Sequence, residues 1–352
     1  MPNDFTKLLL EWNRSGNTRQ MPWKGEKDPY KIWLSEVVLQ QTRVEQGLAY
    51  YEKFIERFPT ITDLAMAPDE LVFKTWEGLG YYSRCRNLLA TARTIAFEKS
   101  GVFPDSYEDI LKLKGVGPYT AAAIASFAFG QPQAVLDGNV FRVLSRYFGI
   151  CTPIDTPEGK KLFSQLAKAL LYQDDPAVYN QAIMDFGAVV CKPQQPACET
   201  CILRGDCQAF QLGCIDRIPV KSRSILRRNR FFYYFILSWK GGYYIRQRKE
   251  SDIWQNLHEW VLLERSEILE ADAAGFKKEL KILLDTAVGE VREISVVQKQ
   301  QLTHQTISGR FIRVELQTPL PENSGYRLVR REELSAIAFP RYITRYLETH
   351  PL

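Results

Sequence analysis

The chain has 352 residues. This length exceeds that of a domain with a single hydrophobic core and predicts two domains. Its 45% hydrophobic and 25% charged residues are typical of a soluble globular protein, and no apolar run approaches the ~20 residues of a membrane span. Without a secretory signal, these features exclude a membrane-embedded or exported chain and predict a cytoplasmic location. The net charge of +5 permits a polyanionic partner without requiring one.

Helical periodicity dominates the chain from residue 3 to about residue 190. Two helices have clear starts, because Asp28 and Thr156 are each followed by proline, the order of an N-cap and a first helical position. The spacing of apolar residues predicts helices over 44–57, 68–76, 84–99, 107–112, 118–128, 139–148, 157–172 and 176–190. The sequence therefore predicts an all-α domain over residues 1–215.

The helix that Asp28 opens, in "DPYKIWLSEVVLQQT", carries an acidic residue, Glu36, on an apolar face. Its neighbours four and three positions before it and three positions after it are Ile32, Trp33 and Leu39. An acid on such a face is desolvated, which favours its protonated form. Most helical glutamates are solvated and have no special role, and these neighbours argue against that interpretation. The pattern identifies Glu36 as a functional residue.

A glycine turn, Gly115-Val116-Gly117, separates two of the predicted helices in "LKGVGPYTAAA". Such a turn exposes backbone N–H groups at the positive end of a helix, where a phosphate oxygen can bind. The turn is a weak signal alone, because many turns between helices contain two glycines. The bulky Tyr119 follows just inside the next helix.

A second carboxylate, Asp137, precedes Gly138 and Asn139 in "VLDGNVFRVLSR". The following residues open a helix, so the Asp137 carboxylate can lie at a helix N-terminus and remain ionised. An ordinary N-cap is the alternative interpretation.

Four cysteines are spaced as Cys191-x6-Cys198-x2-Cys201-x5-Cys207. A reducing cytosol disfavours disulfides, so metal ligation is the better interpretation. Four thiolates suit an iron–sulfur cluster or tetrahedral zinc, and the spacing alone does not choose between them. All three histidines lie after residue 257, which excludes a histidine-based site in the helical part.

The composition changes near residue 216. Residues 217–230, "RIPVKSRSILRRNR", contain six Arg or Lys and no acid, which suits an exposed connector that either follows a phosphate backbone or is simply solvated. Beyond it, 231–249 predicts two strands around a Gly-Gly turn, 270–287 a helix and 309–318 another strand. The sequence thus predicts a basic linker over 216–229 and an α+β domain over 230–352.

The cysteine spacing resembles the four-iron cluster loop of the endonuclease III and MutY class of DNA glycosylases, and the glycine turn resembles the helix-hairpin-helix of that superfamily. "MPWKGEKDPYKIW" and "LSEVVLQQT", with Glu36, resemble MutY-type adenine DNA glycosylases, because endonuclease III-like enzymes lack an acid there. The resemblance is dense over 19–207 and thin over 230–352. It implies a 4Fe–4S cluster bound by the four cysteines.

The resemblance implies a role for each polar residue of the site. Protonated Glu36 would donate to N7 of a flipped adenine and later activate water, while Asp137 would stabilise or briefly capture the sugar cation. Asn139 and Tyr119 would orient these groups. Tyr119 stands where bifunctional relatives have a lysine, and a phenol cannot form a Schiff base, so base removal without efficient strand scission is expected.

The resemblance implies that the partner is double-stranded DNA with adenine opposite 8-oxoguanine or guanine. The protein would bind this DNA as a monomer, and DNA binding would place it at the nucleoid. The backbone at Gly115, Val116 and Gly117 would bind phosphate. Gln41 and Tyr81, in "LQQT" and "LGYYSRCRN", match residues that fill the gap left by a flipped base. Core packing is the alternative for Tyr81.

The C-terminal third resembles, more thinly, the Nudix-like (MutT-like) domain that checks the opposite strand in MutY-type enzymes. "IWQNLHEWVLLE" resembles its Trp-rich strand, and no acid-rich Nudix box is present, so pyrophosphate hydrolysis is not expected. Leu302, Thr303 and His304 match the end of the lesion-recognition loop. An upstream histidine is missing, Leu302 replaces the usual phenylalanine, and a structural role is the alternative for His304.

Three other functions are alternatives. An endonuclease III-like glycosylase and lyase acting on oxidised pyrimidines is the nearest, and Glu36, Tyr119 and the extra domain count against it. A non-catalytic DNA-binding module would not explain Glu36 on its apolar face together with Asp137. A Nudix hydrolase would need the missing metal-binding box.

Overall fold

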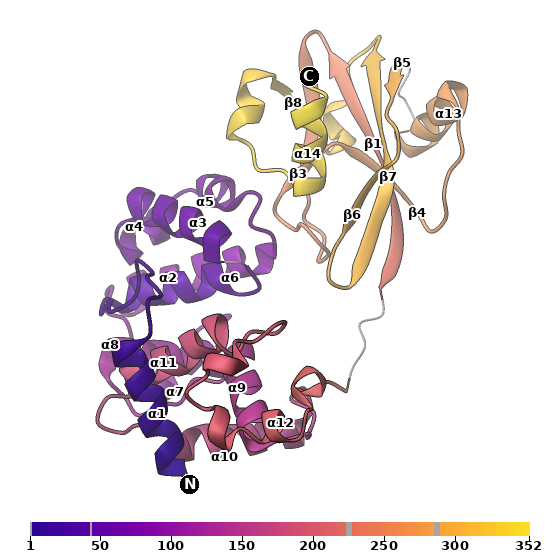
Figure 1. The fold of residues 1–352 in the computed structure, drawn as a ribbon. Helices are drawn as coiled ribbons and strands as arrows, with labels where there is room; N and C mark the ends of the chain where they lie inside the picture. Colours follow the sequence, from indigo (N-terminus) through magenta and orange to yellow (C-terminus); the bar gives the residue numbers. More distant parts are fainter. Residues whose placement is uncertain (1, 43, 223–226, 285–288) are drawn as a thin grey trace. The chain divides into compact units, whose positions relative to one another are not determined.

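The computed structural model describes residues 2–42, 44–222, 227–284 and 289–352 (Figure 1). The chain divides into two compact units, one joining Met1–Met66 to Asn87–Ser224 and the other joining Ala67–Arg86 to Ile225–Leu352. Hydrogen bonds hold the short segment in the second unit: Lys74 Nζ donates to Ile337 O at 3.0 Å, and Phe339 N donates to Glu77 Oε1 at 2.8 Å. No sequence pattern predicts this grouping.

The described part of the chain before residue 217 is helical, as predicted. The α-helices are α1 (Pro2–Ser15), α2 (Pro29–Leu39), α3 (Val44–Arg57), α4 (Ile61–Met66), α5 (Asp69–Trp76), α6 (Tyr82–Arg93), α7 (Tyr107–Leu111), α8 (Pro118–Phe129), α9 (Gly138–Phe148), α10 (Pro157–Leu170), α11 (Pro176–Val189) and α12 (Gln208–Gln211). The predicted helix over 84–99 is confirmed as α6 followed directly by one π-helical turn over Thr94–Glu98. No helix in the described ranges is long and apolar enough to cross a membrane.

The predicted helix starts are confirmed by their caps. Asp28 Oδ1 accepts from Tyr30 N at 2.9 Å, and Thr156 Oγ1 accepts from Gly159 N at 3.1 Å, with proline at the first helical position in both helices. Behind these starts, α1, α8, α9, α10 and α11 share one apolar core, to which α1 contributes Phe5. This core fixes the helices that carry the polar residues of the site.

The second unit is built on a sheet whose strands, in the described residues, are β1 (Arg228–Trp239), β2 (Gly242–Gln247), β3 (His258–Glu259), β4 (Val261–Arg265), β5 (Gly289–Ile294), β6 (Gln298–Gln301), β7 (Gln305–Leu316) and β8 (Arg327–Arg330). β1 pairs antiparallel with β2 and β4 and parallel with β7. A side-chain carbon at Gly309 would lie 1.6 Å from Phe232 O, so β7 approaches β1 this closely only with glycine.

The predicted hairpin between β1 and β2 is confirmed, with its turn one position earlier than expected. Lys240 and Gly241 both have positive φ, as a tight two-residue hairpin requires. The predicted linker includes residues 223–226, and the predicted helix over 270–287 includes 285–287, all of which lie outside the described residues. Within them, that helix is α13 (Ala273–Leu284).

Helices cover both faces of the sheet. Successive side chains of β1 point to opposite faces, so neighbouring residues of this strand pack against different helices. Tyr233 and Phe235 pack in a core with Phe276 of α13. Between them, Tyr234 faces Tyr342 of α14 (Arg341–Thr349), with ring centroids 6.2 Å apart. Figure 1 shows α13 and α14 on either side of the sheet.

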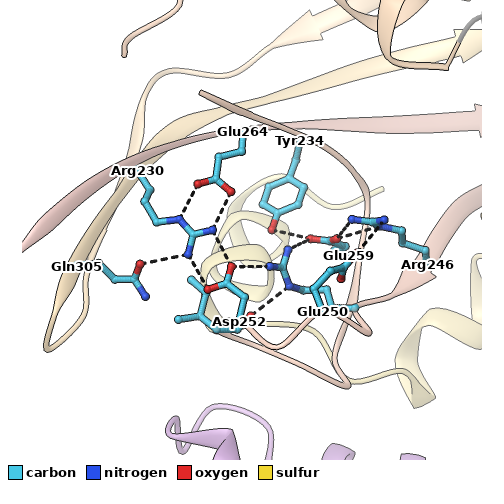
Figure 2. A network of polar contacts seen from close by, with 10 residues as sticks. Arg230, Tyr234, Arg246, Glu250, Asp252, Glu259, Glu264 and Gln305 are labelled. Atoms are coloured by element: carbon cyan, nitrogen blue, oxygen red, sulfur yellow. Dashed lines mark hydrogen bonds and ion pairs between the residues drawn. The ribbon is translucent and has the colours of Figure 1, made fainter. Parts of the chain in front are cut away.

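A partly buried network of ion pairs joins the strands at one end of this sheet (Figure 2). Its members are Arg230, Tyr234, Arg246, Arg248, Glu250, Asp252, Glu259, Glu264 and Gln305. Arg230 donates two hydrogen bonds to Glu264, at 2.7 Å each, and one to Gln305 Oε1 at 3.2 Å. Since Gln305 begins β7 directly after residues 302–304, the network fixes the strand that follows the predicted recognition loop.

Candidate active site

A cavity of about 680 Å³ in the first unit brings together the residues that the sequence singles out for catalysis. It is lined by Glu36, Gln41, Tyr119, Asp137 and Asn139. They come from α2 and the turn after it, from α8 and from the start of α9. The cavity therefore places two carboxyl groups, a phenol and an amide around one space.

Glu36 is the buried acid of this cavity. Its side chain is only 8% exposed, and Ile32 and Leu39 of α2 line the cavity beside it, as the apolar face predicts. Burial, together with the nearby charge of Asp137, raises the pKa of Glu36 to about 7, and a hydrogen bond with Tyr119 opposes the shift. Near neutral pH, a large fraction of Glu36 can hold a proton to donate.

Asp137 is the N-cap of α9 and also lines the cavity, so its role as a helix cap is compatible with a catalytic role. Its Oδ1 accepts from Val140 N at 2.8 Å, and its Oδ2 accepts from Asn139 Nδ2 at 2.8 Å. The helix start was expected to keep this carboxylate ionised. Burial acts against that expectation, because it raises the pKa of Asp137 more than these donors lower it.

Arg142 braces the Asp137 side of the cavity, and sequence reasoning missed it. The buried guanidinium donates to Asn139 Oδ1 at 2.7 Å, to Gly187 O at 2.6 Å and to Cys191 O at 2.7 Å. A side-chain carbon at Gly187 would lie 2.6 Å from Asn139 Cβ, so α11 and α9 need glycine there. The available signal was the spacing of Asn139 and Arg142 on one helical face.

Tyr119 lies one residue into α8, whose N-cap is Gly117. Its hydroxyl donates to Met184 Sδ at 3.5 Å and also forms a hydrogen bond with Glu36. In the preceding turn, Gly115 has a φ of +79°, and a side-chain carbon there would meet Asn87. Among the described residues, the N–H groups of Gly115 and Gly117 have no protein acceptor, which leaves them available to a phosphate.

Gln41 and Tyr81, the predicted gap-filling residues, share an uncommon backbone conformation. Gln41 has a φ of 57° and Tyr81 a φ of 49°, and both side chains are exposed. Non-glycine residues in this region cost on the order of 1–3 kcal/mol each and gather at functional sites. Exposure argues against the core-packing alternative for Tyr81.

The predicted recognition residues form the connection between β6 and β7. Leu302 N donates to Gln305 O at 2.8 Å, and His304 O accepts from Arg228 N at 3.0 Å. Within this second unit, Thr303 Oγ1 and the Tyr81 hydroxyl lie 2.6 Å apart in a hydrogen bond. Two residues predicted to read the DNA independently are thus in contact.

The four predicted metal-ligating cysteines, Cys191, Cys198, Cys201 and Cys207, line one small cavity with Arg146. The buried Arg146 guanidinium donates to Cys191 Sγ at 3.5 Å. Burial raises the pKa of Cys201 to about 11, so a positively charged ligand would have to stabilise its thiolate. Within the described ranges, no three or more His, Cys, Asp or Glu side chains are arranged to hold a single metal ion.

Known protein families match both parts of the chain. Residues 34–169 match the HhH-GPD superfamily of base excision DNA repair proteins, and residues 233–349 match the NUDIX domain. These matches confirm the predicted helix-hairpin-helix and Nudix-like folds. Among solved structures, a thermostable thymine-DNA glycosylase has a TM-score of 0.56 at 30% identity, covering 60% of this chain and 97% of that one. A non-covalent endonuclease III–DNA complex has a TM-score of 0.52 at 20% identity, covering 60% and 98%, and shows the fold.

Curated proteins of similar sequence identify the family more narrowly than these domain matches do. The chain is 36% identical to the adenine DNA glycosylase of Buchnera aphidicola subsp. Baizongia pistaciae over 255 residues, 72% of each chain. It is 42% identical to the adenine DNA glycosylase of Homo sapiens over 217 residues, 59% of this chain and 39% of the human protein. The chain belongs to the adenine DNA glycosylase family of base excision repair enzymes.

Proposed function

We propose that the chain hydrolyses the N-glycosidic bond of adenine paired with 8-oxoguanine or guanine in double-stranded DNA. The observation that carries the proposal is the buried Glu36 carboxyl, with its raised pKa, in the same cavity as Asp137. A base must leave the helical stack to reach such a cavity. Two carboxyl groups in different environments are the arrangement that acid-assisted glycosidic cleavage uses.

Each residue of the cavity has a place in the reaction. Protonated Glu36 donates to N7 of the flipped adenine, which makes the base a better leaving group. As the glycosidic bond breaks, the sugar gains positive charge, and Asp137 stabilises it or captures it briefly. Asn139 holds Asp137 through its amide, and the Glu36 carboxylate then takes a proton from the attacking water.

Tyr119 supports a monofunctional reaction. A phenol cannot form the imine with the sugar that precedes strand scission. Lys112, a nearby amine, instead pairs with Asp109 at 2.8 Å and is largely exposed. An endonuclease III-like lyase remains the alternative, and it requires an amine where Tyr119 lies.

The contact between Tyr81 and Thr303 supports recognition of the base opposite adenine. An exposed aromatic ring in a strained conformation can enter the stack, and Thr303 can bond the edge of the base that the ring contacts. Leu302 and His304 flank Thr303 in the same turn. We propose that these four residues read the strand opposite the excised adenine, with Gln41 filling the gap on the other strand.

We also propose that the four cysteines bind a 4Fe–4S cluster. Each iron of such a cluster takes one cysteine, so four thiolates are needed. Four thiols that line one cavity can supply these ligands. When bound, the cluster would hold the 191–207 loop against α9; iron content and visible absorption test its presence.

The test is base release from defined duplexes. The full chain is incubated with duplexes carrying adenine opposite 8-oxoguanine or guanine, and the products are treated with alkali. Breaks at adenine that depend on alkali are expected. Breaks without alkali at an oxidised pyrimidine would favour the lyase, and intact adenine in both duplexes would overturn the proposal.

A further inference from the structure

Arg84 of α6 packs its side chain against the exposed Tyr81. Its guanidinium carbon Cζ lies over the Tyr81 ring, 5.4 Å from the ring centroid, and over the Trp76 ring, 5.2 Å from that centroid. Trp76 is fully buried, whereas Tyr81 is 42% exposed. All three residues belong to the segment Ala67–Arg86 of the second unit. One cation therefore connects an exposed ring to a buried one.

The same residues fix the backbone on both sides of Tyr81. Trp76 Nε1 and Arg84 Nη2 donate to Gly80 O, at 2.9 and 3.4 Å. These two bonds hold the peptide group that precedes Tyr81, and Arg84 N holds the one that follows by donating to Tyr81 O at 2.8 Å. A residue has only two soft backbone torsions, so fixing both peptide groups maintains the uncommon φ of 49° at Tyr81. Arg84 thus helps to offset the strain of this conformation.

The Arg84 guanidinium is a charged group in a partly buried position. Burial lowers the pKa of Arg84 to about 10, which still leaves it protonated near neutral pH. The face of an aromatic ring attracts a cation, and the attraction is stronger where water is excluded. At its other end, the Tyr81 hydroxyl bonds Thr303 Oγ1 at 2.6 Å. The Tyr81 ring is therefore held by its face, by its hydroxyl and by its backbone.

A ring that is held in this way loses little freedom when it enters a base stack, whereas a mobile ring must first be ordered. We propose that Arg84 is a positioning residue that keeps Tyr81 ready to enter the stack beside the base opposite the excised adenine. This inference rests on the proposed function, which assigns Tyr81 to that strand. It gives Arg84 no contact with the DNA, so the loss of Arg84 should matter only while the Tyr81 ring is present.

The test is a double-mutant cycle on binding by the full chain. The duplex carries 2′-fluoro-2′-deoxyadenosine opposite 8-oxoguanine, in which the fluorine opposes formation of the sugar cation and preserves the base. Arg84→Met keeps an unbranched side chain and removes the charge, and it should lower affinity about fivefold, as expected for one desolvated cation–π contact. In the Tyr81→Ala background, the same substitution should lower affinity by less than about twofold.

A fluorescent base gives a second readout that a general loss of stability would not imitate. 2-Aminopurine placed beside the 8-oxoguanine changes its emission when the ring stacked on it changes. Binding of the wild-type chain should change this emission, and Arg84→Met should reduce the change. Arg86→Met removes one charge from the same helix, where Arg86 Nη1 donates to Gln255 O at 3.3 Å, and should leave the change as in the wild type.

Arg84→Lys separates support of the ring from simple charge. Lysine keeps a charge that a phosphate could bind, but it lacks the planar group that covers two rings, so affinity should fall as it does for Arg84→Met. This variant also serves if Arg84→Met does not fold. Equal loss with and without the Tyr81 ring, or full recovery by lysine, would overturn the inference. If Tyr81→Ala costs no affinity, the proposed role of Tyr81 fails together with the inference. Failure of the wild-type chain to release adenine would instead overturn the proposed reaction.

Discussion

Replacing Glu36 by glutamine is expected to slow base release by orders of magnitude and to stabilise the folded protein increasingly as the pH rises. The pKa of Glu36 rises from 4.5 to about 7, chiefly because the side chain is buried. The folded state therefore binds this proton more tightly than the unfolded state does. Below pH ~4.5 Glu36 is protonated in both states and does not lower the free energy of unfolding. As the pH rises the free energy of unfolding falls, and above pH ~7 the loss reaches about 3 kcal/mol.

The assay is urea unfolding of the wild-type protein and Glu36→Gln between pH 4.5 and pH 8, about the interval of the shift. Glutamine has nearly the same shape and does not titrate, so the variant should gain on the wild type by about 3 kcal/mol across this interval. Ser35→Ala, a buried substitution on the same helix, should shift stability equally at each pH. A difference between Glu36→Gln and wild type that does not change with pH would refute the reasoning. Single-turnover base release by Glu36→Gln should fall by about 10²–10⁴.

Three further substitutions test other parts of the account. Tyr119→Lys introduces an amine beside the sugar, so borohydride should trap abundant protein–DNA adduct with this variant and little with wild type. Thr303→Ala removes the bond to Tyr81 and should reduce the preference for 8-oxoguanine over guanine opposite adenine by about fivefold in single-turnover rates; an unchanged ratio would contradict this role. Glu259→Ala leaves the buried Arg248 short of a partner and should cost about 3–5 kcal/mol in urea unfolding, whereas a loss below about 1 kcal/mol would show the pair to be dispensable.

The features that local chemistry determines could be predicted from the sequence. Asp28 and Thr156 mark helix starts because an N-cap followed by proline is readable in a few residues. The desolvation of Glu36 follows from its helical neighbours, and the structure confirms its burial. The roles of Asp137 and Asn139 in the reaction stay predictions, although both line the cavity with Glu36.

The features that depend on distant residues could not be predicted. Tyr81 and Thr303 are 222 positions apart, and nothing in either segment indicates the other. Arg19 donates a hydrogen bond to the buried Asp185 although the two are 166 positions apart, and an aspartate in a helix is normally solvated. The same limit applies to the parallel pairing of β1 with β7, which depends on the close approach at Gly309.

The most direct test of the account is a site-resolved NMR titration of the Glu36 carboxyl in the full chain, with a 2′-fluoroadenosine duplex bound. Catalysis by proton donation requires that this group stay sheltered from water and protonated near neutral pH. The account predicts a midpoint at or above the value of about 7 that burial gives the free protein. A hydrated Glu36 that titrates near 4.5, as an ordinary glutamate does, would contradict it.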